Sequence, residues 1–300
     1  MSGIGQASID YITIVDGYPA EDTKEEAEGF VVAGGGPAAT ALVGLSRLGV
    51  KAYFMGVVGD DDAGAAIIKG LENESVDVKG IRVRKGGESQ RAVIIVNRKD
   101  GTRTIVWKRP SASMLKAREI DLARILRSDM LLLDGLMPEA SLKGAAIARD
   151  AGIPVLLDAG RVREGMMELC ALSDYVVCSA DFAAGLGLTP ARTAERLSAM
   201  GCTAATVTLG PGGSVTLCDG RLIDQKAFDV DAVDTTGAGD VFHAGYAYGA
   251  LMGWPIEKTV EFASAFAAIK CMSIGGRAGI PTLAATMRFI KERGEGDMRR

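Results

Sequence analysis

Apolar, β-branched runs recur along the chain with the length of buried strands. Five stand out, at residues 53–58, 129–134, 153–158, 174–178 and 203–209. Amphipathic stretches of helical length lie between and around these runs, at residues 37–48, 63–74, 139–151, 190–200, 241–252 and 256–272. Continuous apolar strands that alternate with helices are typical of a parallel sheet covered on both faces. The pattern therefore predicts a three-layer α/β/α fold with a mainly parallel central sheet.

Two regions depart from this alternation and predict a separate small sheet. Residues 10–33 and 89–107 contain short, alternating β-prone segments, and Asp100-Gly101 is a hairpin turn signal. We expect antiparallel strands there, built from two separated pieces of chain. Such a sheet is either a lid over a pocket or an extension of a sheet edge, and the pattern leaves both interpretations open.

Length and net charge narrow the classes of function. A chain of 300 residues can bury a large core, and its length leaves one or two domains open. The formal net charge is −4. This charge argues against nucleic acid as the main partner, because neutralising phosphates requires a basic face.

Cysteine usage and the length of the apolar runs favour the cytoplasm. The 5 cysteines are scattered, odd in number and without a CxxC pair, which is typical of reduced thiols. The first residues lack the basic and apolar pattern of a signal peptide, and no apolar run is long enough to span a bilayer. We therefore expect a cytoplasmic protein with no membrane partner.

A single histidine, His243, limits the chemistry that the chain can perform. Metal centres with several histidines are excluded, and a hydrolase with a histidine base would have to use this residue. His243 follows Asp240-Val241-Phe242 on a predicted helix. We expect it to pack in the core or to support a neighbouring site residue.

The segment at residues 230–249, VDAVDTTGAGDVFHAGYAYG, carries the clearest chemical signal. Glycines allow a tight turn that leaves the amides of Gly237, Ala238 and Gly239 uncovered at the start of a helix. Amides at a helix start have no intrahelical partner and meet the positive end of the helix dipole. This arrangement predicts an anion hole for a phosphoryl group in transfer.

Asp240 falls in the first turn of the same predicted helix, beside the anion hole. A carboxylate at this position can accept the proton of an attacking hydroxyl, as phosphoryl transfer requires. The alternative is an ordinary first-turn acid that stabilises the helix dipole. A bare GxGD string favours the alternative, whereas the full seven-residue DTTGAGD segment favours the base.

DTTGAGD resembles the second signature of the ribokinase-like (PfkB) carbohydrate kinases, in which the final aspartate is the catalytic base. Other stretches resemble the family in the same order along the chain: AGGGPAATALVGLSRLG at 33–49, GVVGDDDAG at 56–64, VTLGPGG at 207–213 and GGRAGIP at 275–281. The resemblance covers the whole chain. It implies a single ribokinase-like kinase domain over residues 1–300, with segments of a small β-sheet lid at about 11–33 and 89–109 inserted in the α/β core. It also implies the phosphorylation of a sugar hydroxyl by ATP with Mg²⁺.

The resemblance also implies roles for individual residues. It implies sugar binding by Asp10, Gly34, Gly35 and Thr40. For the nucleotide it implies Thr208, Gly210, Gly212, Gly213 and Gly276. Asp234 and Thr236 lie where the family orders a loop with K⁺, so K⁺ is an expected cofactor. The resemblance further implies a homodimer formed through the lids.

Two positions depart from the family pattern. Thr40 stands where the first signature usually has an asparagine that bonds substrate hydroxyls, which predicts altered sugar recognition. Cys178-Ser179-Ala180-Asp181 stands where many relatives have an Asn-x-x-Glu segment that organises magnesium through water. Asp181 is the candidate substitute for that glutamate.

The sulfofructose kinase branch is the part of the family that the chain resembles most in appearance. Lys24 matches a lysine that contacts the acidic group of the substrate in that branch. A substrate-binding arginine and two asparagines of that branch are matched by Leu136, Lys108 and Gly29, so its pocket is not reproduced. Lys24, Lys108 and Arg109 flank the lid segments and are candidates for binding an anionic sugar, or else are solvated surface charges.

Three other functions compete with a sugar kinase. A nucleoside kinase is disfavoured by the few aromatic residues near the lid, since base recognition usually needs stacking surfaces. A non-catalytic sugar-sensing protein on the same fold is disfavoured by Asp240 and the intact anion hole. A dinucleotide-dependent oxidoreductase is disfavoured because GIGQAS does not fit the GxGxxG pattern.

Overall fold

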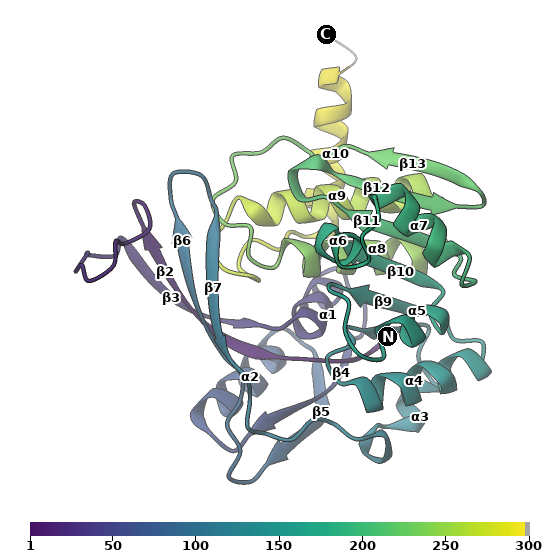
Figure 1. The fold of residues 1–300 in the computed structure, drawn as a ribbon, viewed down its shortest axis with the longest axis horizontal. Helices are drawn as coiled ribbons and strands as arrows, with labels where there is room; N and C mark the ends of the chain where they lie inside the picture. Colours follow the sequence, from purple (N-terminus) through teal and green to yellow (C-terminus); the bar gives the residue numbers. More distant parts are fainter. Residues whose placement is uncertain (298–300) are drawn as a thin grey trace.

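The computed structural model describes residues 1–297, in which a large sheet carries helices on both faces (Figure 1). The strands of the large sheet are β1 (Ser2–Ile4), β4 (Tyr53–Gly59), β5 (Asp77–Arg84), β8 (Leu131–Leu133), β9 (Val155–Ala159), β10 (Tyr175–Ser179), β11 (Ala204–Thr208), β12 (Ser214–Cys218) and β13 (Arg221–Gln225). Their order across the sheet is β13-β12-β11-β10-β9-β8-β1-β4-β5. Pairing from β5 through β11 is parallel, and only β12 and β13 pair antiparallel among the described strands. The predicted mainly parallel sheet is confirmed.

Alternate residues of the central strands enter two separate cores. In β4, Phe54 belongs to one hydrophobic cluster, while Tyr53 and Met55 belong to the other. One face of the sheet is covered by α1 (Pro37–Arg47), α2 (Asp62–Asn73), α8 (Ala238–Leu251), α9 (Ile256–Cys271) and α10 (Leu283–Asp297). The opposite face is covered by α3 (Leu122–Ile125), α4 (Pro138–Asp150), α5 (Met166–Ala171), α6 (Ala180–Gly185) and α7 (Pro190–Ser198). This is the three-layer architecture that the hydrophobic pattern predicts.

A smaller sheet projects from the edge of this body (Figure 1). Its strands are β2 (Ser8–Val15), β3 (Gly29–Gly35), β6 (Arg91–Asn97) and β7 (Arg103–Lys108), in the order β3-β2-β6-β7. It combines two separated pieces of chain, as predicted. The expectation of purely antiparallel pairing is wrong, because β2 and β6 pair parallel. These two strands follow β1 and β5, which leave the large sheet in the same direction.

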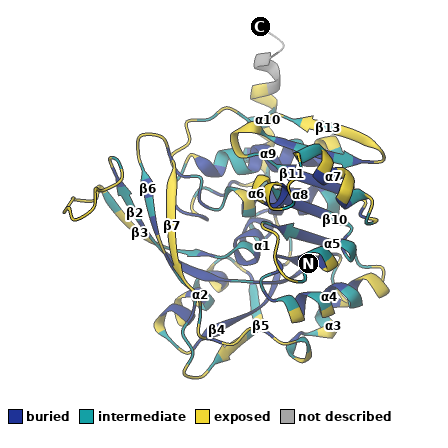
Figure 2. Ribbon diagram, in the orientation of Figure 1, coloured by how far each residue is buried: buried dark blue, intermediate teal, exposed yellow. Residues whose placement is uncertain are grey.

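The two faces of the small sheet differ in burial. Ile12, Ala92, Ile94 and Val96 form a buried cluster on the inner face, against which Ile274 packs. Large apolar side chains are exposed on the outer face, and β7 is exposed along its length (Figure 2). No helix within residues 1–297 is long and apolar enough to cross a membrane.

Close packing of α8 on α9 holds the start of α8 in place. A Cβ atom at Gly245 would lie 2.8 Å from the Cα of Ala263, so the two helix backbones are in contact at this point. Gly44 on α1 is constrained in the same way, since its Cβ would lie 2.7 Å from the methyl group of Ala244. Small residues thus set the position of α8 between α1 and α9.

Replacement of Gly245 by valine is expected to lower the free energy of unfolding by about 1–3 kcal/mol through overpacking. Gly70→Val is the matched control, because Gly70 also lies in a helix and a Cβ there would meet open space. Urea denaturation of both variants measures the difference. Equal midpoints for the two variants would contradict the close packing of α8 and α9.

Candidate active site

Acidic side chains gather where the parallel strands end. Asp134 follows β8, Asp158 lies near the end of β9, and Asp240 lies in the first turn of α8. Burial, together with the negative charge of Asp158, raises the pKa of Asp240 to about 7, while His243 opposes the rise. A carboxyl group with this pKa can take up a proton at neutral pH.

A backbone turn before α8 presents amide groups beside Asp240. Gly237 has a φ of 74°, and its Cβ would lie 2.9 Å from the Cα of Gly276, so only glycine fits here. The amide of Ala238 donates to the Thr235 carbonyl at 3.2 Å. Within residues 1–297, the amides of Gly237 and Gly239 have no acceptor, and the space beside Gly239 is open. Two free amides at a helix start can therefore bind an anion.

Asp234 fixes this turn to the loop that follows α9. Its Oδ1 accepts the amide of Thr236 at 2.8 Å, and its Oδ2 accepts the amide of Gly275 at 2.7 Å. The Lys270 ammonium donates to the Asp234 main-chain carbonyl at 2.7 Å. Asp234 and Lys270 are both fully buried. The position of the amide turn thus depends on one buried acid and its three partners.

Potassium, which the family resemblance implied, does not fit this corner well. Both carboxylate oxygens of Asp234 already accept backbone amides, and a protein ammonium already lies on its carbonyl. The Thr236 hydroxyl is buried and, within the described residues, has no hydrogen-bond partner. Among the side-chain oxygens of Asp234 and Thr236, only this hydroxyl is without a partner, which is fewer than the ring of oxygens that holds K⁺.

Asp10 lies at the inner face of the small sheet, beside the glycines of the first motif. Ser8 donates its hydroxyl to Asp10 Oδ1 at 2.8 Å, and burial raises the pKa of this carboxyl group. A side chain at Gly35 would overlap the Asp10 carboxylate. Gly35 therefore leaves the carboxylate room.

Arg277 connects the first motif to the last one. Its guanidinium donates to the Gly35 carbonyl at 2.8 Å and to the Thr40 hydroxyl at 3.3 Å. Burial lowers the pKa of Arg277 to about 10. A Cβ at Gly34 would overlap the guanidinium, so this glycine makes room for the arginine. Thr40 is fully buried and bonded to Arg277, and its predicted role in sugar binding stays a prediction.

Four of the five residues predicted to bind nucleotide lie at the end of β11 and on the turn that follows it, whereas Gly276 lies after α9, against Gly237. Thr208 ends β11 and donates to the Cys178 carbonyl at 3.3 Å, and a 3₁₀ turn (Gly210–Gly212) follows. Gly213 has a φ of 88°, and a Cβ there would overlap the Gln225 carbonyl, so this glycine is also required for strand pairing. The nucleotide roles stay predictions.

The other predicted site residues lie at the surface. Lys24 is exposed in the connection between β2 and β3. The side chains of the remaining three have partners within the protein: Lys108 pairs with Glu88 at 2.6 Å, Arg109 lies 5.3 Å from the Trp107 ring centroid, and Asp181 pairs with Arg161 at 2.8 Å. Their proposed roles remain untested.

Several site residues escaped the sequence analysis. Asp134 and Asp158 stand at the ends of predicted strands. Because ligands of α/β sheets bind at the carboxyl ends of strands, this position could have identified both residues as site candidates. Lys270 is a lysine within the apolar pattern of a predicted helix, which was a second signal. Arg103 of β7 donates to the Thr235 hydroxyl at 2.5 Å and so joins the small sheet to the amide turn. Only the folded chain brings these two residues together.

No group of three or more histidine, cysteine or acidic side chains in the described part of the chain is arranged to hold a metal ion. Mg²⁺ does not require one, because it keeps several waters and binds one or two carboxylates together with substrate phosphates. Asp158, the acid that acts most strongly on Asp240, fits such a role. The residues present are therefore compatible with Mg²⁺ brought in with a nucleotide.

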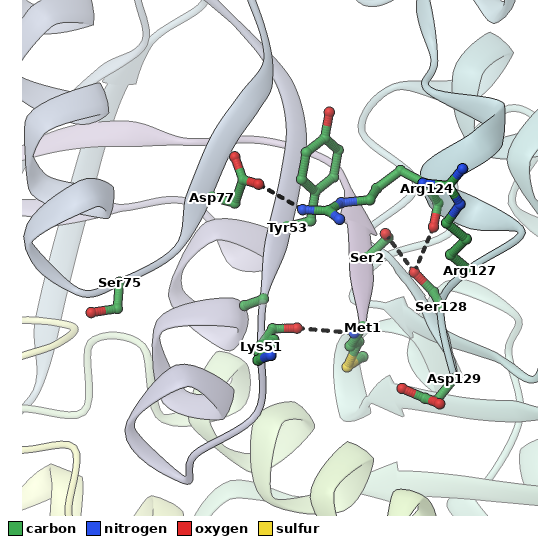
Figure 3. Close-up of a pocket in the computed structure, with 11 residues that line it drawn as sticks. Met1, Ser2, Lys51, Tyr53, Ser75, Asp77, Arg124, Arg127, Ser128 and Asp129 are labelled. Carbon is green, nitrogen blue, oxygen red and sulfur yellow. Dashed lines mark hydrogen bonds and ion pairs between the residues drawn. The ribbon is translucent and has the colours of Figure 1, made fainter.

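A polar pocket of about 380 Å³ lies at the opposite edge of the large sheet (Figure 3). It is lined by residues at or before the amino ends of strands, including Ser2, Tyr53 and Asp77. Arg124 crosses it, paired with Asp77 at 2.6 Å and lying 4.6 Å from the Tyr53 ring centroid. The pocket is separate from the acids around Asp240, and its Arg124 and Asp77 side chains neutralise each other.

Comparison with known proteins agrees with this geometry. Residues 2–283 match the model of the pfkB family of carbohydrate kinases. The chain is 30% identical to the ATP-dependent ribose-1-phosphate kinase of Halopiger xanaduensis over 309 residues, covering 96% of this chain and 97% of that protein. It is 26% identical to the ribokinase of Haemophilus influenzae over 298 residues, covering 96% of this chain and 97% of that protein. These relatives do not confirm the sulfofructose kinase branch as the nearest one.

The fold is that of solved ribokinase structures. The crystal structure of a putative ribokinase from Agrobacterium tumefaciens superposes with a TM-score of 0.90 at 28% identity, covering 98% of each chain. The whole described architecture, including the small sheet, has its counterpart there. The chain thus belongs to the pfkB family of carbohydrate kinases and is an ATP-dependent, ribokinase-like kinase of a sugar or nucleoside.

Proposed function

We propose that Asp240 is the general base in the transfer of the γ-phosphate of ATP to a hydroxyl of a sugar or sugar derivative. The observation that carries this proposal is a carboxyl group with a pKa of about 7 beside two free amides at a helix start. The carboxylate accepts the hydroxyl proton as the substrate oxygen forms its bond to the γ-phosphorus. The bond between that phosphorus and the ADP oxygen breaks, and the amides of Gly237 and Gly239 stabilise the charge on the phosphoryl oxygens.

Mg²⁺ would neutralise the triphosphate charge when bound. Asp158 would hold it through water, and Asp181 remains the alternative acid suggested by the family pattern. Asp158 also contacts the only histidine of the sequence, since its Oδ1 lies 3.5 Å from His243 Nε2. His243 also lies 3.3 Å from the Val177 carbonyl, so β10 and α8 position it behind the two acids.

The substrate is a sugar held by Asp10 and the backbone around Gly35. An anionic sugar is supported by the name of the Halopiger relative, whose substrate is already a sugar phosphate. Lys24, Lys108 and Arg109 are the candidate anion-binding residues. A nucleoside is the alternative, and Trp107 favours it: this aromatic ring is half-exposed on the inner face of the small sheet.

The small sheet acts as a lid within a single kinase domain and pairs with a second copy of the chain. Four large apolar side chains support this pairing. They share the outer face of the sheet and are exposed: Phe30 at 67%, Val32 at 53%, Val93 at 49% and Val106 at 63%. A contiguous apolar face of this kind is unusual on a monomer.

Asp240→Asn is expected to lower turnover by about 10²–10⁴-fold while ATP still binds, because the variant keeps the shape but not the base. The assay measures ADP release with Mg²⁺ across neutral sugars, sugar phosphates, sugar acids and nucleosides. Asp224→Asn, an exposed residue of β13, is the control. Near-normal turnover by Asp240→Asn would remove this residue from the base role.

The pH profile provides a second test. Asp240 must be ionised to accept a proton, so kcat/KM is expected to fall as pH drops below about 7. Asp158→Asn removes the neighbouring negative charge that raises the pKa of Asp240, and should move this acid limb to lower pH. An acid limb that Asp158→Asn leaves in place would contradict the coupling between the two acids.

Val106→Asp is expected to convert a dimer into a monomer, because a charge would be buried at the apolar face. Val83→Asp is the matched control, since Val83 is 54% exposed but lies on β5 of the large sheet. Sedimentation velocity measures the mass of each variant. A wild-type protein that is monomeric at micromolar concentration would exclude pairing through this face.

A further inference from the structure

Lys270 is a fully buried lysine near the end of α9. Lysine is almost never fully buried unless it is paired. Its ammonium donates to the main-chain carbonyl of Asp234, the residue that begins the DTTGAGD segment, at 2.7 Å. The adjacent residues Ile269 and Cys271 continue the apolar pattern of the helix. The Lys270 side chain thus places a positive charge in the core, and its ammonium contacts the loop that forms the anion hole.

Each of the two buried cations near the loop has its own carboxylate. Asp234 is the carboxylate that acts most strongly on the Lys270 ammonium. Arg277 is likewise buried, and Asp10 is the carboxylate that acts most strongly on it. A further cation beside Asp234 would be an unmatched buried charge, which is costly in a protein interior.

Several oxygens in this corner already accept hydrogen bonds from the protein. The Cys271 carbonyl accepts the amides of Val233 and Asp234 at 2.8 and 3.1 Å, and the Lys270 carbonyl accepts the amide of Ser273 at 3.1 Å. The Asp234 carboxylate accepts two amides, as described above. The corner is thus closed by groups of the chain itself.

We propose that the Lys270 ammonium is a tethered substitute for a monovalent cation, so that turnover does not depend on added K⁺. This inference rests on the proposed phosphoryl transfer at Asp240. Lys270 is a positioning residue: it holds the Asp234 backbone from the core side, and Asp234 in turn holds the amides of the turn. A covalently attached cation is always present, whereas a free ion occupies its site only according to its concentration.

The wild-type protein gives the first test. ADP release is measured with Mg²⁺ in buffers whose monovalent cation is K⁺, Na⁺ or tetramethylammonium at constant ionic strength. We expect equal turnover in all three buffers, and a melting temperature that K⁺ does not raise. Saturable activation by K⁺, together with a rise in melting temperature over the same concentration range, would overturn the proposal.

Lys270→Ala gives the second test, because it removes the ammonium and leaves space beside the Asp234 carbonyl. Turnover should fall by about 10–100-fold, as is typical when a residue that orients a site is lost. K⁺ or methylammonium should then restore part of the activity and raise the melting temperature, since a ligand that binds only the folded state stabilises it. Rescue by a small cation is not expected of a residue with a merely structural role.

Lys258→Ala is the control on the same helix. Lys258 is exposed, and its ammonium lies over the Trp254 ring at 4.0 Å. This variant should keep wild-type turnover in every buffer. A Lys270→Ala protein that folds and retains full turnover without added cations would also refute the proposal.

The measurements distinguish a failure of the proposed phosphoryl transfer from a failure of the proposed role of Lys270. Absence of ADP release from the wild-type protein with every substrate and every cation would count against the proposed reaction. Robust wild-type turnover that requires K⁺ would leave the reaction intact and reject the substitution by Lys270. If the Ala variant does not fold, Lys270→Met keeps the volume of the side chain without its charge. Its turnover should fall by a similar factor and should not be restored by K⁺, because the methionine fills the space; full turnover of this variant without added cations would refute the proposal.

Discussion

The site depends on one buried carboxylate. Asp234 accepts amides from two loops that lie about forty residues apart in sequence, at Thr236 and at Gly275. An unpaired carboxylate in this interior would be strongly destabilising, so each loop needs the other in place. Gly237 and Gly276 then meet without side chains, and the amides beside them face the same space as Asp240. The geometry of the anion hole follows from satisfying the hydrogen bonds of Asp234.

Electrostatics and topology act together around Asp240. The parallel strands bring Asp134 and Asp158 to the same edge of the sheet, and their charges disfavour ionisation of the acid at the start of α8. Burial at this edge has a larger effect than either charge. The fold therefore raises the pKa of Asp240 through burial and the surrounding acids. The hydrophobic cores on both faces of the sheet offset the unfavourable free energy of burying this group.

Much of the architecture could be predicted because its cause is local. Apolar runs identified β4, β8, β9, β10 and β11, helical periodicity identified α1, α2, α4, α7, α8 and α9, and the DTTGAGD segment identified the start of α8. The long helix α10 was not predicted. The strand β1 has only the residues Ser2–Ile4, too short for a periodic signal, although it lies inside the sheet between β8 and β4. The parallel pairing of β2 with β6, and the meeting of Lys270 with Asp234, depend on contacts between distant segments. No local pattern encodes such contacts.

The short link between β1 and β2 has a mechanical consequence. Residues 5–7 join a central strand of the body directly to a strand of the small sheet. A Cβ at Gly5 would overlap the Asp134 carboxylate and the Ala38 methyl group, so this link is clamped between strand end and helix. The small sheet cannot swing freely about such an anchor, and any opening has to bend or twist the strands themselves. Movement then grows with distance from the anchor, so the exposed far end of the sheet travels furthest while Asp10 stays almost still.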